Sequence, residues 1–172
     1  MLYLVGEYAE QTKRGMTICL QNRLIVPAIT LLYAGIEVLG FLVSDEPYAT
    51  RQTFIDWAEK YLDDFLRRKG LTGIDLYSAR CGVLHTGRAP SKLVDSGSAR
   101  ELWYRFGGES HVNIMTNTPK PAVLIDVEEL IQSFDNGVQR FMTDVDLNSN
   151  LQAQANAKAE RFFRRGMLLS PL

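Results

Sequence analysis

The longest apolar run in the chain, LIVPAITLLYAGIEVLGFLV over residues 24–43, constrains the fold more than any other feature. Its twenty residues are long enough to cross a bilayer as a helix. However, Glu37 lies near its middle, and a carboxylate at the membrane centre costs about 2.5–3.5 kcal/mol. Pro27 interrupts its start, and no other segment is suited to pair with it as a second span. We therefore interpret the run as the central helix of a bundle and expect no membrane association.

Apolar residues recur at helical spacing on both sides of this run. Residues 2–21 carry one apolar stripe, and Thr50 precedes the helical pattern RQTFIDWAEKYLDDFLRR. Thr72 is a candidate cap for a helix through GIDLYSARCGVLH, which should end at the stop signal of Gly87. Two further helices are expected at about 126–143 and 149–165.

Residues 91–125, which follow the helix through GIDLYSARCGVLH, have a residue pattern typical of strands. RELWYRF, the turn GGES and HVNIMTN predict two strands in a hairpin, and KPAVLIDV is a candidate third strand. The expected fold is mainly α: an up-and-down helical bundle of about six helices with a small β-hairpin insertion at about residues 99–125. No repeat or long linker divides the chain, so residues 1–172 are expected to form a single domain.

Charge and motif content exclude several classes of function. The formal net charge is −1, so RNA binding would depend on local clusters such as RRK and RFFRR, which also fit solvated helix ends. The phosphate-binding patterns GxGxxG and GxxxxGK[ST] are absent, and the two histidines lie far apart. We therefore expect neither a cofactor nor a metal site.

The cysteines and the N-terminus suggest where the protein works. Cys19 and Cys81 lie in apolar helical segments without a CxxC pattern, as expected of buried thiols in a reducing compartment. The first ten residues lack the basic region of a secretory signal. The expected location is cytoplasmic.

Arg80 and His85, in RCGVLH, are the candidate reactive residues. The helix around them is apolar, where a lone arginine would be costly, so Arg80 needs a partner. Glu37, the one charge in the central helix, is the natural partner if the two helices are neighbours. His85 lies near the helix C-terminus, where the dipole favours a protonated imidazole. Tyr77 is able either to touch a substrate or to fill the core.

The spacing argues against a site within one chain. Residues five apart on an ideal helix differ by about 140° in direction and about 7.5 Å in rise, so their side chains do not share a face. Two copies of the helix packed about a twofold axis would gather the groups in one cleft. The alternative is structural: Arg80 forms an ion pair with a neighbouring helix, and His85 caps its own helix.

The motif Arg-x-x-x-x-His late in a helical bundle resembles the HEPN superfamily. LLYAGIEVLGFL, FIDWAEKYL and LYSARCGVLHTG are similar to an uncharacterised bacterial group within or near it, over roughly residues 22–90. HEPN proteins occur in toxin–antitoxin and other defence systems. The resemblance implies a dimeric, metal-independent endoribonuclease in which the ribose 2′-OH attacks the adjacent phosphate.

The resemblance also assigns roles to the residues. Arg80 would stabilise charge on the scissile phosphate and His85 would act as general acid or base, with Glu37 and Tyr77 in support. The expected partners are a second copy of the chain, RNA, and an antitoxin or regulator protein. The alternative function is a noncatalytic helical scaffold or protein-interaction module.

Overall fold

The computed structural model describes residues 3–86, 91–107 and 119–166, apart from the side chains of residues 85–86 and 164–166. Within these ranges the chain is mainly helical, as the sequence predicts, with one small sheet. In chain order the elements are α1 (Tyr3–Gln21), α2 (Ile25–Leu42), α3 (Arg51–Tyr61), α4 (Asp63–Lys69), α5 (Gly73–Cys81), the π-helical segment η1 (Gly82–Thr86), α6 (Lys92–Asp95), β1 (Leu102–Arg105), β2 (Val123–Asp126), α7 (Val127–Leu147) and α8 (Ser149–Gly166).

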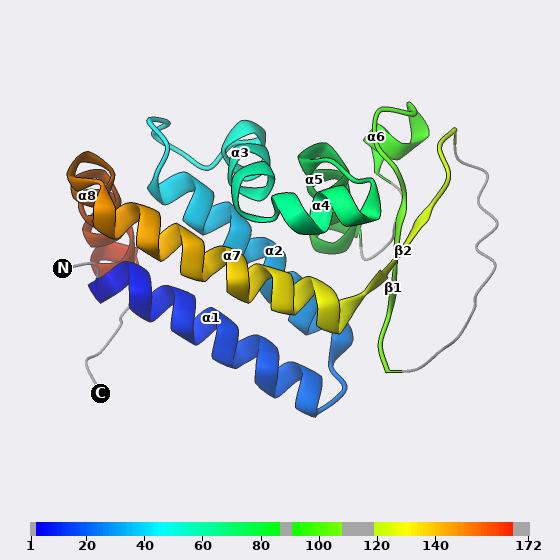
Figure 1. Cartoon of the computed structure of the whole chain (residues 1–172), viewed down its shortest axis with the longest axis horizontal. Coiled ribbons are helices and arrows are strands. Elements are labelled where there is room, and N and C mark those ends of the chain that lie inside the picture. Colours follow the sequence, from blue (N-terminus) through cyan, green and yellow to red (C-terminus); the bar gives the residue numbers. More distant parts are fainter. Residues whose placement is uncertain (1–2, 87–90, 108–118, 167–172) are drawn as a thin grey trace.

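Helix α2 is the central element of the bundle. It contacts α1, α3, α7 and α8, and Leu32, Tyr33, Ile36 and Leu39 have no exposed surface. The 18 residues of α2 have a mean hydropathy of 2.0, enough for a membrane span by length and composition, and 56% of them are buried inside the protein. In Figure 1, α1 and α7 run lengthwise along the bundle, with α8 at one end and the sheet at the other.

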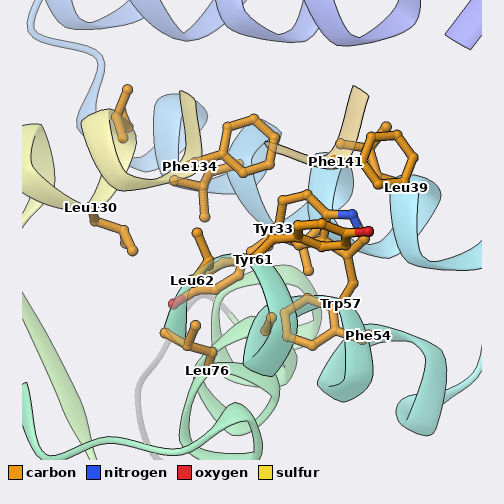
Figure 2. Packing of buried hydrophobic residues seen from close by; sticks show 14 of the residues in the cluster. Tyr33, Leu39, Phe54, Trp57, Tyr61, Leu62, Leu76, Leu130, Phe134 and Phe141 are labelled. Atoms are coloured by element: carbon orange, nitrogen blue, oxygen red, sulfur yellow. The ribbon is translucent and has the colours of Figure 1, made fainter. Parts of the chain in front are cut away.

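An aromatic cluster joins α3 to α7 in the core. The ring of Trp57 lies 5.2 Å from that of Tyr61, 5.7 Å from that of Phe134 and 6.1 Å from that of Phe141, centroid to centroid. Figure 2 shows these rings with Tyr33 and Phe54 in one continuous core. Such pairs add about 0.5–1.5 kcal/mol each beyond the area they bury.

The predicted helix over RQTFIDWAEKYLDDFLRR is two helices. Thr50 and Thr53 form a capping box at the start of α3, as the position of Thr50 suggests. At the break, Arg140 of α7 donates hydrogen bonds to the backbone carbonyl of Tyr61 and, at 2.6 Å, to Asp63 Oδ1. Because the Arg140 side chain bonds the Tyr61 carbonyl, α3 ends at Tyr61 and a second helix, α4, begins at Asp63. This split and the short α6 raise the count of α-helices in the described ranges to eight rather than about six.

Within the described residues, the sheet pairs the first predicted strand with the third. β1 pairs in parallel with β2, with Leu102 opposite Val123 and Arg105 opposite Asp126. Leu102 and Ile125 are buried, so pairing β1 with β2 places apolar side chains on the core. Asp126 then caps α7 by accepting hydrogen bonds from the backbone N–H groups of Glu128 and Glu129. The predicted strand HVNIMTN lies outside the described residues.

Helix α8 packs over the end of α2. The ring of Phe163 stacks on Tyr8 at 5.1 Å, and the ring of Phe162 meets Phe41 edge-on at 4.8 Å. The Lys158 ammonium donates hydrogen bonds of 2.8 Å to the carbonyls of Phe41 and Glu46. A cation thereby satisfies carbonyl groups at the C-terminus of α2 and in the following turn.

Close helix packing at Gly40 leads to a stability prediction. A Cβ at Gly40 would collide with the backbone carbonyl of Thr53 in α3, whereas a Cβ at Gly6 would meet only Met142 Cε at 3.7 Å. Gly40→Ala is expected to lower the free energy of unfolding by about 1–3 kcal/mol because α2 and α3 must separate. Gly6→Ala should be neutral or stabilise by up to about 1 kcal/mol through helix propensity. Urea unfolding would measure both, and equal midpoints for the two variants would contradict the packing.

Candidate functional site

Glu37 and Arg80 form an ion pair between α2 and α5. A single guanidinium nitrogen, Nη2 of Arg80, lies 2.8 Å from Glu37 Oε1 and 2.6 Å from Oε2. The Arg80 side chain is 13% exposed and that of Glu37 26% exposed. The sequence-based prediction that these residues pair is confirmed, and the pair reaches the surface on one side.

The start of α5 is fixed by a network that sets the position of Arg80. The Asp75 carboxylate accepts hydrogen bonds from the backbone N–H of Thr72 at 2.8 Å and from that of Arg100 at 2.7 Å. A Cβ at Gly73 would lie 3.1 Å from the Ile55 carbonyl, so only a small residue lets α5 begin this close to α3. With its first turn held in this way, α5 directs its last turn and Arg80 toward α2.

The Glu37 carboxylate keeps the Arg80 guanidinium charged. Burial alone would lower the pKa of Arg80, but the hydrogen bonds and the negative charge of Glu37 outweigh burial and raise this pKa overall. The pair is therefore neutral as a unit. A phosphate approaching it would meet a cation whose charge is already balanced.

Tyr77 and Arg51 extend the site toward α3. The carbon Cζ of Arg80 lies 5.9 Å from the Tyr77 ring centroid and that of Arg51 lies 5.7 Å from it. Phe54 packs edge-on against the same ring at 5.6 Å, so Tyr77 is both a core residue and a contact of two cations. Burial, followed by the adjacent Cys81 thiol, raises the pKa of Tyr77, which keeps the phenol protonated.

Sequence reasoning missed Arg51. This residue is the first of α3 and lies 29 positions before Arg80, so no local motif connects the two. Only the packing of α3 against α5 brings Arg51 to Tyr77. The one sequence signal near it, the Thr50 cap, indicates a helix start and carries no information about α5.

The backbone changes its winding between Arg80 and His85. α5 ends at Cys81, and residues 82–86 form the π-helical segment η1. In a π-helix each hydrogen bond joins residues five apart, so the backbone is wound more widely than in an α-helix. Arg80 lies in α5 and precedes this segment, so the wider winding applies to residues 82–86. The His85 side chain itself lies outside the described residues.

The site holds groups suited to an anion rather than to a metal ion. Two arginines and a tyrosine hydroxyl are donors, and Glu37 already accepts from Arg80. No group of three histidine, cysteine or carboxylate side chains suited to a metal ion occurs among the described residues. In comparisons with family models, curated proteins and solved structures, nothing matched this chain.

Because the Glu37–Arg80 ion pair has little exposed surface, we expect it to stabilise the fold more than a surface ion pair does. A double-mutant cycle with Glu37→Ala and Arg80→Ala should give a coupling energy of about 1.5–3 kcal/mol, because the hydrogen bonds are charge-assisted and mostly screened from water. The matched control is the surface pair of Asp64 and Arg67, whose side chains are 59% and 78% exposed. That pair should couple by about 0–1 kcal/mol. Equal coupling energies from urea unfolding would show that the central pair behaves as an ordinary surface ion pair.

Proposed function

We propose that this protein is a HEPN-like, RNA-binding protein that cleaves RNA without a metal ion. The observation that carries the proposal is Arg80: an arginine held in place by Glu37, 13% exposed, five positions before a histidine. The family resemblance of RCGVLH supplies the reaction class.

The reaction that fits these residues is an internal transfer at one phosphodiester. The ribose 2′-oxygen loses its proton and bonds to the adjacent phosphorus, and the bond from phosphorus to the 5′-oxygen breaks. The leaving 5′-oxygen gains a proton, and a 2′,3′-cyclic phosphate remains. In this proposal Arg80 stabilises charge on the phosphate oxygens and His85 transfers a proton. Glu37 and Tyr77 are positioning residues because they contact Arg80.

The proposal includes a homodimer and a cellular setting. Two copies about a twofold axis would present four reactive side chains to one strand, as the resemblance implies. A toxin–antitoxin or defence system would then supply a regulator protein that restrains cleavage. Expression of the unregulated chain in bacteria is accordingly expected to slow growth.

The alternative is a noncatalytic scaffold or interaction module, and one observation favours it. Glu37 already balances the charge of Arg80, which is what a purely structural ion pair requires. In that case Arg80 stabilises the bundle and substrates never reach it. Cleavage assays separate the two functions.

The cleavage test uses labelled single-stranded RNA in EDTA. The wild type is expected to produce fragments ending in 2′,3′-cyclic phosphate, because no step needs a metal ion. Arg80→Ala and His85→Ala should each reduce the rate by at least about 100-fold, the lower range for loss of one charge-stabilising or proton-transfer group. Gel electrophoresis and mass spectrometry of the fragments would measure this.

The surface variant Arg14→Ala serves as the control and should cleave like the wild type, since Arg14 is exposed on α1 and lies outside the basic clusters. Light scattering of the active sample should give twice the mass of one chain. Equal background cleavage by all four folded proteins would reject the nuclease and leave the scaffold.

A further inference from the structure

An apolar groove lies beside the ion pair, between α2 and α8. Val38 and Phe41 of α2, Tyr48 and Ala49 of the following loop, and Phe162 of α8 line a cavity of about 300 Å³. Such a volume is at the lower end of those that take small organic ligands. Tyr48 is 69% exposed, so its ring is available to a ligand at the mouth of the groove.

Two residues that line the groove are close in the chain to residues of the cationic site. Ala49 precedes Arg51 by two residues, which limits their Cα separation to about 7.6 Å because consecutive Cα atoms are 3.8 Å apart. On α2, Phe41 is one turn after Glu37 and so lies on the same side of the helix. The apolar lining is therefore close to Arg51 through Ala49 and to Glu37, the partner of Arg80, through Phe41.

One positive charge at this surface is not balanced by an ion pair. Glu37 compensates Arg80, whereas within the ranges that the structure describes no carboxylate forms an ion pair with Arg51. Arg51 is exposed and contacts the Tyr77 ring, which orients its guanidinium without neutralising it. An apolar recess beside such a cation is complementary to a ligand with a flat apolar part and one negative charge.

We propose that this surface is a binding subsite for one nucleotide of single-stranded RNA. The base enters the groove and stacks on Tyr48, and its phosphate binds Arg51 next to Arg80. The inference rests on the proposed function and adds to it the residues that position the strand. A single strand fits because its bases are free to stack on an aromatic side chain, whereas paired bases are enclosed in the helix. Stacking on a tyrosine ring accepts any base, so the subsite positions the strand without selecting a sequence.

The test measures binding separately from cleavage. A fluorescent 2′-O-methyl oligoribonucleotide has no free 2′-OH to attack the phosphate, and its anisotropy reports affinity in EDTA over a series of salt concentrations. Tyr48→Ala is expected to weaken binding about 5- to 150-fold, the range for loss of one base–aromatic stack. Arg51→Ala should also weaken binding and reduce the slope of log K against log salt by about 0.7, as loss of one phosphate contact does.

Two controls sharpen the result. Arg14→Ala removes an exposed arginine on α1, outside the basic clusters, and should leave both affinity and slope unchanged. An abasic oligonucleotide should bind the wild type and Tyr48→Ala equally, yet still lose affinity with Arg51→Ala. Circular dichroism would confirm that each variant is folded.

The possible outcomes distinguish failure of the nucleotide subsite from failure of the proposed RNA-binding function. If the wild type does not bind the oligonucleotide, both are overturned. If it binds and the Tyr48 and Arg51 variants behave like Arg14→Ala, the nucleotide subsite is wrong while RNA binding stands. An unchanged salt slope in Arg51→Ala also overturns the subsite, because the phosphate contact is part of it.

Discussion

The ion pair of Glu37 and Arg80 is the interaction on which the fold and the proposed chemistry both depend. α2 is buried on most sides, and a carboxylate in such a helix needs a cation at hydrogen-bond distance. Arg80 provides it at 2.6 Å, which joins α5 to the centre of the bundle. The same contact restricts the guanidinium to one orientation near the surface. Stability thus explains why the pair exists, and its exposed side is what the proposed chemistry requires.

In the proposed function this region would bind an anion without a strongly basic surface. The formal net charge of the chain is −1, and Glu37 neutralises Arg80. Arg51 adds a cation beside an apolar groove, with Tyr77 in contact with both arginines. A strand bound there would be held by one local charge and by stacking, in keeping with the absence of a global positive field.

The sequence was most informative where periodicity and chemistry agree. The α2 run, the Thr50 and Thr72 helix starts and the Glu37–Arg80 pair follow from apolar spacing, capping and the cost of a buried charge. A turn signal predicts a local hairpin partner for β1, and that partner lies outside the described residues. The parallel pairing of β1 with the distant β2, which buries Leu102 and Ile125, was not predicted. Neither the break at Leu62 nor the position of Arg51 was predictable, since each depends on packing between distant helices: Arg140 on Tyr61, and α3 on α5.

The most direct test of the central claim is an NMR titration that observes arginine side chains. The central claim is that Arg80 is both the partner of Glu37 and a contact of the RNA phosphate. With a 2′-O-methyl oligoribonucleotide, the guanidinium resonances of Arg80 should shift in proportion to the bound fraction, whereas those of the exposed Arg14 on α1 should stay constant. Saturable RNA binding that leaves the Arg80 resonances unchanged would contradict the claim and restrict Arg80 to a structural role.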